Sequence, residues 1–372
     1  MAARGSAPAV ESVRVAAYTV PTDQPEADGT AAWDSTTLVV VHASAGDSVG
    51  FGWTYGPAAC ADLVEHLLSP VVVGRDVLGV PGSWEAMVRA ARNATRAGAV
   101  GYAISAVDVA LWDLKARVLG IPLVDLFGRV HDAVPIYGSG GFTTYDDSRQ
   151  AEQLAGWVDG QGIGRVKIKI GQDWGGDVPR DLARIAAARS TIGDAPQLFV
   201  DANGAYTRKQ AVRLWRAAAD LGVDWFEEPV SSDDLAGLRE VRDLVDTDVT
   251  AGEYGTDITY FRRMCAAGAV DCLQVDATRA GGYTEWLRAA AVAASHGLQV
   301  SGHCAPHLHA PVAAATPNLR HLEWFHDHVR IEHLLLDGTE SGDGGSVPVQ
   351  ATRPGHGYTF DADKAAAYQV RR

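Results

Sequence analysis

The sequence has few cysteines, no long apolar run and no excess of basic residues. Its four cysteines form no C-x-x-C pair, which is typical of free thiols in a reducing compartment. No apolar stretch approaches the roughly 18 residues that a membrane span needs, and the N-terminus shows no secretory apolar region. The 32 basic and 46 acidic side chains give a net charge of −14, which disfavours phosphate backbones and anionic lipid. We therefore expect a cytoplasmic protein with no nucleic-acid or membrane partner.

The composition is that of a folded, globular chain. Hydrophobic residues make up 47% of the 372 residues and charged residues 21%, so the chain can bury a core of its own. Residues 11–53 contain short β-rich runs, interrupted by a stretch at 21–35 whose Pro, Asp and Gly content predicts an exposed, mobile loop. Residues 57–120 show helical spacing and end on Gly120, followed by Ile121 and Pro122.

A different rhythm begins near Ala133, where eight short apolar runs alternate with helix-compatible sequence. Their recurrence every roughly 20–30 residues predicts parallel βα units that close into a barrel. A doubly wound open sheet is the alternative, but the expected Gly-rich phosphate turn after an early strand is missing. The eighth run precedes Gly- and Asp-rich sequence rather than a full closing helix, and the tail after it could return to the N-terminal strands.

Two lysines mark the second predicted barrel strand. Lys167 and Lys169 are two residues apart, so both side chains face the same side of the strand. A solvated face is the ordinary interpretation of such a pair. Strands of a parallel barrel are covered on both sides, which places the pair at the barrel mouth instead. Two close ammonium groups disfavour each other's charge, so we expect one lysine to have a lowered pKa suited to proton abstraction.

Three acidic residues end the next three strands. Asp201, Glu227 and Glu253 would converge on one side of the barrel mouth, where uncompensated carboxylates repel unless a cation bridges them. An all-oxygen donor set favours Mg²⁺ over zinc. Any one of these acids could instead cap the following helix, but that explanation is poor for three in register.

Histidine and aspartate end later strands. His303 suits an acid or base whose ring Asp276, on the neighbouring strand, could hold and whose pKa it could raise. A satisfied core histidine is the alternative. The run of His303, His307 and His309, with Cys304, invites a zinc interpretation, but its spacing matches no standard zinc pattern. Three further histidines are expected in a polar loop: His326, His328 and His333.

These motifs together resemble the enolase superfamily and, within it, the mandelate racemase subgroup. The matching segments, in the family's order, are V-K-I-K-I-G, V-D-A-N-G, W-F-E-E-P, A-G-E, Q-V-D-A-T-R-A-G-G, S-G-H and L-E-W, the last with Glu323. They span about 135–325. The muconate-cycloisomerase branch would place a second lysine at Asp276, so this aspartate argues against that branch.

The resemblance implies an α/β fold, a modified (β/α)7β TIM-type barrel with an α+β capping domain. The cap would comprise residues 1–130, completed by the tail 340–372, and the barrel residues 131–339. A substrate-gating loop would fall on 21–32 and a second capping loop near 50–55. The resemblance assigns Mg²⁺ to Asp201, Glu227 and Glu253, where it binds the substrate carboxylate and stabilises an enediolate.

The resemblance also implies roles for the remaining residues. Lys167 would neutralise the carboxylate and lower the pKa of Lys169, which acts as a base on one face of the substrate. His303, oriented by Asp276, acts on the other face, and Glu323 hydrogen-bonds a carboxylate oxygen. Weaker candidates for contact with the substrate or its surroundings are Asn203, Asp23 and Trp53.

The same metal ligands and the same pair of proton-transfer residues can catalyse several reactions. The leading prediction is dehydration of a polyhydroxylated acid to a 2-keto-3-deoxy acid, because the expected gating loop is polar. The alternative is a racemase or epimerase of a 2-hydroxy acid that uses the same Lys169 and His303. A non-catalytic metal-binding homologue is less favoured, since no ligand or base is missing. The expected partners are a small-molecule carboxylate substrate and further copies of the chain in a homo-oligomer.

Overall fold

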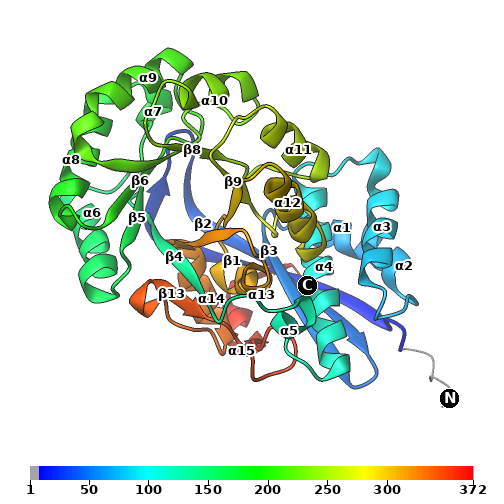
Figure 1. The fold of residues 1–372 in the computed structure, drawn as a ribbon. Helices are drawn as coiled ribbons and strands as arrows, with labels where there is room; N and C mark the ends of the chain where they lie inside the picture. Colours follow the sequence, from blue (N-terminus) through cyan, green and yellow to red (C-terminus); the bar gives the residue numbers. More distant parts are fainter. Residues whose placement is uncertain (1–7, 372) are drawn as a thin grey trace.

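Eight parallel strands close into a barrel in the computed structural model, which describes residues 8–371 (Figure 1). Each strand pairs with the next along the chain, and the last pairs in parallel with the first, as at Leu322 and Ile136. This closure confirms the predicted barrel and leaves no open sheet edge. The strands are β4 (Ala133–Gly140), β5 (Arg165–Lys169), β6 (Gln197–Asp201), β7 (Val223–Glu227), β8 (Asp248–Ala251), β9 (Cys272–Val275), β10 (Gln299–Gly302) and β11 (Leu319–Phe325).

A ring of helices covers the outside of the barrel (Figure 1). They are α6 (Asp147–Ala155), α7 (Gln172–Gly175), α8 (Val178–Ile192), α9 (Arg208–Ala217), α10 (Leu235–Arg242), α11 (Ile258–Ala266), α12 (Tyr283–Ser295), α13 (Pro306–Ala314) and α14 (His326–Leu335). The last helix corrects two expectations, because residues 326–335 were expected to form a polar loop and no full helix was expected after the eighth strand. Although the sequence of this helix is largely polar, one of its faces points inward and buries Ile331, Glu332 and Leu335.

The cap is an antiparallel sheet in the order β15-β1-β2-β3 with helices packed against it. Its C-terminal strand pairs with β1, as between Ala17 and Arg371, so the tail does return to the N-terminal strands. The remaining tail elements are β12 (Leu336–Asp337), β13 (Ser346–Pro348), β14 (Thr359–Phe360) and α15 (Ala362–Ala365). The cap elements are β1 (Ser12–Ala27), β2 (Ala32–Ala45), β3 (Ser48–Tyr55), β15 (Gln369–Arg371), α1 (Cys60–Leu63), α2 (Ser69–Val72), α3 (Val80–Ala90), α4 (Ala99–Leu119) and α5 (Leu123–Phe127).

Helix α4 joins the cap to the barrel. Gly50 and Gly52 let its backbone approach β3, since a Cβ at Gly50 would lie 2.2 Å from the Leu114 nitrogen. Asp108 on α4 accepts hydrogen bonds from the Thr284 backbone N–H at 3.0 Å and the Thr284 hydroxyl at 2.6 Å. That carboxylate caps the first turn of barrel helix α12, where exposed backbone donors favour negative charge. Between residues 8 and 371, no helix has the length and apolarity needed to cross a membrane.

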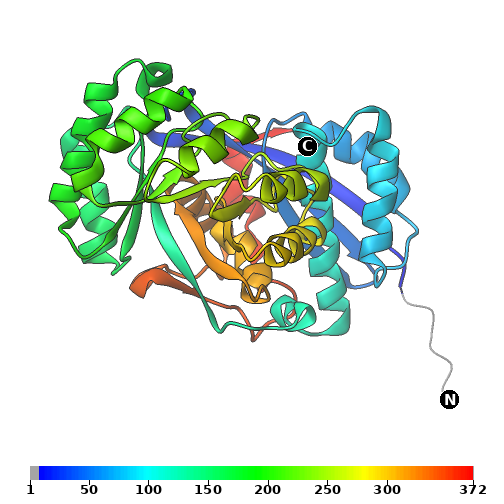
Figure 2. The same cartoon turned by 45° about the horizontal axis from the view of Figure 1, so that its top comes forward.

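Residues 21–32 form a hairpin over the barrel mouth. Figure 2 shows the β1 and β2 ends reaching from the cap to the barrel, and backbone N–H groups of Thr143 and Trp174 donate to the carbonyls of Ala27 and Gly29 at 2.8 and 2.9 Å. The expected exposed loop is therefore largely β-structure, because two barrel loops satisfy its backbone. The second expected capping loop, near 50–55, is part of strand β3.

Candidate active site

An aromatic layer lies beneath the polar residues in the barrel. Tyr137, Phe199 and Trp225 are buried together, and Phe199 stacks on Trp225 with ring centroids 5.3 Å apart. The Lys167 ammonium lies 5.3 Å from the centroid of the Tyr137 ring, and the Trp225 indole donates to Glu227 Oε2 at 2.9 Å. This aromatic layer excludes water below the site, and the charged groups lie above it along the barrel axis.

Lys167 connects the carboxylates across the barrel. Its Nζ lies 2.6 Å from Glu227 Oε1 and 2.8 Å from Glu323 Oε1, and its side chain has 0% exposure. Burial works to lower the pKa of Lys167, but these carboxylates outweigh burial and hold the pKa well above the usual lysine value. Because the ammonium is enclosed, Lys167 makes no direct contact with the cavity and acts by holding these carboxylates in place.

Strand register brings Lys169 beside two of the three acidic residues. Lys169 pairs in register with Asp201, and Asp201 with Glu227. The Lys169 ammonium donates to Asp201 Oδ2. Burial and Lys167 both act to lower the pKa of Lys169, but Asp201 outweighs them and raises it. The expected lowering by Lys167 is thus present as an influence, while the net direction of the Lys169 pKa is upward.

Glu253 enters the site two residues after β8. Gly252 makes this possible with φ +138°, because a Cβ there would lie 2.1 Å from the Gln274 carbonyl oxygen. Arg279 Nη1 donates to Glu253 Oε1 at 3.1 Å. Glu253 Oε2 is buried and accepts no hydrogen bond within the described chain.

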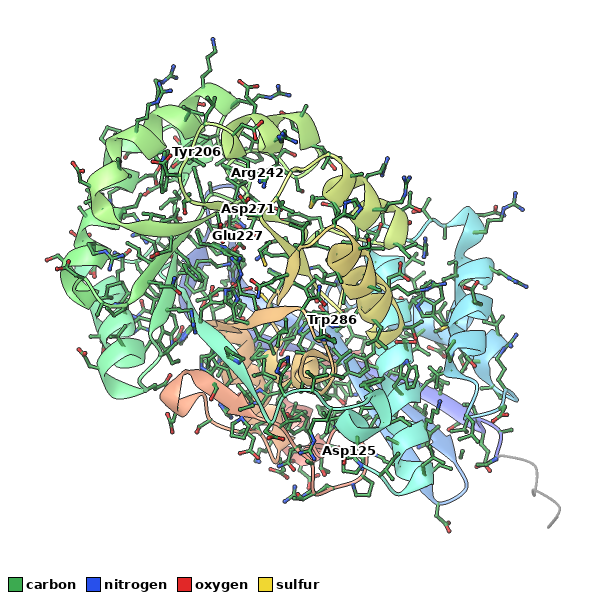
Figure 3. All side chains as sticks on the ribbon, in the orientation of Figure 1. Asp125, Tyr206, Glu227, Arg242, Asp271 and Trp286 are labelled. Carbon is green, nitrogen blue, oxygen red and sulfur yellow. The ribbon has the colours of Figure 1, made fainter. Side chains whose placement is uncertain are left out.

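The three carboxylates fit a hard divalent cation. Asp201, Glu227 and Glu253 are buried, and each offers an oxygen within 4.8 Å of the other two. Glu253 Oε2 is buried without a hydrogen bond and lies 3.3 Å from His303 Nε2, so a cation would satisfy this costly buried oxygen. Neighbouring Glu228, which the sequence reasoning left unassigned, adds a fourth buried carboxyl whose pKa burial and Glu253 raise well above its usual value. Figure 3 shows Glu227 within the ring of strands.

His303 is held in a defined orientation on the other side of the triad. Its Nδ1 lies 2.8 Å from Asp276 Oδ2, and its Nε2 lies 3.3 Å from Glu253 Oε2. Burial acts to lower the pKa of His303, but Glu253 first, and then Glu323 and the hydrogen bond to Asp276, raise it overall. The Asp276 contact fixes the ring and leaves Nε2 for proton transfer.

Glu323 is enclosed by protein groups. The Ser139 hydroxyl donates to its Oε1 at 2.6 Å and the Cys304 backbone N–H to its Oε2 at 2.8 Å. With 0% exposure, it does not line the cavity over the site. In this arrangement Glu323 positions Lys167 and the residue after His303, and its hydrogen bond to a substrate oxygen stays a prediction.

A cavity of about 350 Å³ lies between the barrel mouth and the cap. Lys169 and His303 line it, as does Asn203, which was a weaker candidate. His328, expected in a polar loop, also lines it and stacks on Tyr55 with ring centroids 3.4 Å apart. The cap side is formed by Asp28, Trp33, Ser35, Thr36, Thr37, Tyr55, Gly56 and Pro57.

Two weaker candidates lie outside this cavity. Trp53 is 1% exposed and packs in the cap core, where its indole donates to Glu332 Oε1 at 3.2 Å. Asp23 contacts His326 Nε2 at 3.0 Å and lies 3.6 Å from Arg149 Nη2. A sequence pattern marks an aromatic or acidic residue but cannot tell which side of a bent strand it faces.

The other histidines of the zinc interpretation have separate partners. His307 Nδ1 lies 2.7 Å from Glu332 Oε2, and His309 Nε2 accepts from the Ala277 backbone N–H at 2.8 Å. His309 Nε2 also lies 3.7 Å from Asp276 Oδ1, on the carboxylate that holds His303. Arg279 was also unassigned, although it follows Asp276 by three residues. That spacing could have signalled the ion pair, in which Arg279 Nε lies 3.4 Å from Asp276 Oδ2.

Comparison with known families matches almost the whole described chain. Residues 12–128 match the family "Mandelate racemase / muconate lactonizing enzyme, N-terminal domain". Residues 149–364 match "Enolase C-terminal domain-like". The two matches fall on the cap and the barrel, so both halves of the architecture point to the same group of proteins.

Individual relatives agree with the family match. A mandelate racemase/muconate lactonizing enzyme-like protein from Rubrobacter xylanophilus has 47% identity and a TM-score of 0.94, over 98% of this chain and 100% of that one. A racemase from Streptomyces coelicolor A3(2), solved with bound magnesium, has 30% identity and a TM-score of 0.91, over 97% and 100% of the two chains. L-talarate/galactarate dehydratase of Salmonella typhimurium is 30% identical over 295 residues, 78% of this chain and 73% of its own. Other related enzymes include cycloisomerases and an epimerase.

Proposed function

The chain belongs to the mandelate racemase/muconate lactonizing enzyme family, and on that basis we propose that it is a magnesium-dependent dehydratase of a sugar acid. The substrate is a 2,3-dihydroxy carboxylate and the product a 2-keto-3-deoxy acid. When bound to Asp201, Glu227 and Glu253, Mg²⁺ supplies Lewis-acid stabilisation of negative charge on the substrate carboxylate. Magnesium in the solved racemase relative supports this choice of ion.

The observation that carries the proposal is the placement of two proton-transfer groups around one cavity. Lys169 ends β5, and His303 follows β10. Around the closed sheet, β4 and β11 separate these strands on one side and β6 to β9 on the other. The carboxylates of β6 to β8 therefore lie between Lys169 and His303, and a substrate held there presents opposite faces to them.

The proposed reaction balances with these two groups. One of Lys169 and His303 removes the proton on C2, and the electron pair forms a C2–C3 double bond as the C3–O bond breaks. His303 is the assigned acid, which protonates the departing hydroxyl so that it leaves as water. The resulting enol tautomerises to the 2-keto acid. Asp276 orients His303 throughout, and Lys167 keeps Glu227 and Glu323 in place.

The dehydratase relative from Salmonella typhimurium supports elimination as the outcome. The racemase from Streptomyces coelicolor favours a second candidate, in which the proton returns to C2 from the opposite face. Both reactions need Lys169 and His303, and only elimination needs a leaving hydroxyl on C3. The polar cap side of the cavity, with Asp28, Ser35 and Thr37, offers hydrogen bonds to a hydroxylated chain and favours elimination.

The test is a panel of aldonic, uronic-derived and aldaric acids incubated with enzyme and Mg²⁺ in deuterium oxide. Proton NMR follows exchange at C2, and a carbonyl-trapping reagent detects 2-keto acid. We expect keto product from at least one acid and its loss in both Lys169→Ala and His303→Asn. One of these variants should still exchange the C2 proton. Deuterium incorporation with inversion and no keto product would establish the racemase instead.

A further inference from the structure

A second set of ligand atoms lies beside the three carboxylates. His303 Nε2 is 3.3 Å from Cys304 Sγ and 3.8 Å from Glu323 Oε2. The three ligand atoms all lie within 4.8 Å of one another, and all three residues are buried. His303 and Cys304 line the cavity, so an ion that enters with solvent can reach them.

Two of the three separations match those expected between donors on one tetrahedral ion. Zinc-type ions bind sulfur and nitrogen at about 2.0–2.3 Å, which puts neighbouring donors roughly 3.3–3.8 Å apart at the tetrahedral angle. The distances from His303 Nε2 to Cys304 Sγ and Glu323 Oε2 are 3.3 and 3.8 Å. Because His303 and Cys304 line the cavity, water is available there as a fourth ligand.

The surrounding contacts pre-organise this set. Asp276 holds His303 Nδ1 at 2.8 Å, the carboxylate support that metal-binding histidines commonly have. The Cys304 backbone N–H holds Glu323 Oε2 at 2.8 Å, beside its own side chain. Cys304 and Ala305 both have positive φ, +51° and +38°, and the chain there turns the thiol back against the imidazole ring.

We propose that His303, Cys304 and Glu323 form a second metal site, selective for a thiophilic divalent ion such as Zn²⁺ or Cd²⁺. On binding, the Cys304 S–H bond breaks, a metal–sulfur bond forms, and the proton passes to solvent. The proton on His303 Nε2 also passes to solvent, and the freed lone pair binds the metal. Mg²⁺ prefers oxygen ligands and does not compete for sulfur or nitrogen, so the two sites differ in ligand chemistry.

The occupied site blocks proton transfer, a consequence that rests on the proposed function. His303 Nε2 is the atom assigned to protonate the leaving hydroxyl, and a metal bond at this nitrogen takes the place of the proton that it would donate. The thiophilic ion is therefore an inhibitor that acts without displacing magnesium. It is a regulatory ligand of the catalytic cavity.

The direct test is a titration of the magnesium-loaded enzyme with Cd²⁺, followed by the ultraviolet absorption of cadmium thiolate. We expect one equivalent to produce the band in the parent protein. The control Cys265→Ser, on α11 and 5% exposed, should keep it. Cys304→Ser and Cys304→Ala should both lose it, and Asp276→Asn should weaken cadmium binding by roughly 10–100-fold.

Several outcomes would overturn the proposal. These are absence of the band at one equivalent, its survival in both Cys304 variants, or its loss in Cys265→Ser. A second arm measures turnover at saturating Mg²⁺, where parent and Cys265→Ser should lose activity with the same cadmium dependence as the band. The cadmium-thiolate band requires no substrate. A band without any dehydration would therefore refute only the proposed function, and dehydration without a band would refute only the proposed metal site.

Discussion

Glu26 in the hairpin should make the stability of this protein depend on pH. The carboxyl is 0% exposed, Trp33 Nε1 donates to its Oε2 at 2.8 Å, and its Oε1 has no partner within the described residues. Burial first, and then the nearby charge of Asp327, raise its pKa to about 8. Asp23 adds to this rise, while the Trp33 hydrogen bond and Arg330 oppose it.

The sign follows from proton binding in the two states. A carboxyl whose pKa is higher in the folded chain binds its proton more readily there, so its stabilising contribution is full at low pH and is lost as the pH rises towards 8. Each pH unit between the unfolded value, about 4.5, and the folded value costs about 1.4 kcal/mol. Between pH 5 and 7 the loss from this group is therefore roughly 2.5 kcal/mol.

The substitution Glu26→Gln removes this ionisation and keeps the shape. We expect the difference in unfolding free energy, variant minus parent, to rise by roughly 2.5 kcal/mol from pH 5 to pH 7. Urea unfolding followed by tryptophan fluorescence measures it at each pH. A constant cost of the buried amide cancels in this comparison, and Glu152→Gln, at an exposed position, is the matched control. Parallel pH profiles for parent and Glu26→Gln would refute the reasoning.

Three further predictions concern the site. Glu253→Gln should abolish turnover and weaken Mg²⁺ binding measured by calorimetry while the circular dichroism is unchanged, and full activity after exhaustive chelation would contradict the metal assignment. The cations that line the cavity, Lys169 and Arg279, are on the barrel side, and no lysine or arginine lies among the described cap residues that line it. Acids with one carboxylate should therefore be preferred, and Asp28→Asn should raise kcat/KM for diacids relative to monoacids roughly five- to tenfold, about 1 kcal/mol; an unchanged ratio would place the second carboxylate elsewhere. Gly252→Ala should lower the unfolding free energy by about 2–4 kcal/mol, because its Cβ would meet the Gln274 carbonyl at 2.1 Å, and a urea midpoint equal to the parent's would show that the backbone can adjust.

Much of the site was determined by local sequence. The acidic residues of the triad each follow a short apolar run, and parallel strands place their carboxyl ends on one face of a barrel. Lys169, Asp201 and Glu227 could be placed together because neighbouring parallel strands in register bring them side by side. The two-residue spacing of Lys167 and Lys169 likewise fixed their common face.

Only the tertiary structure decided how these residues are shared between substrate, metal and protein. Lys167 and Glu323 are both 0% exposed, and they pair with each other from strands far apart in the sequence. Trp53 packs in the cap core, whereas His328 lines the cavity. His328 belongs to α14, a helix that was not predicted because its sequence is largely polar. Cys304 meets the ring of His303 because two residues with positive φ turn the chain at that point. Sequence spacing specifies which face of a strand a side chain occupies, but burial and pairing depend on what the rest of the fold packs against that face.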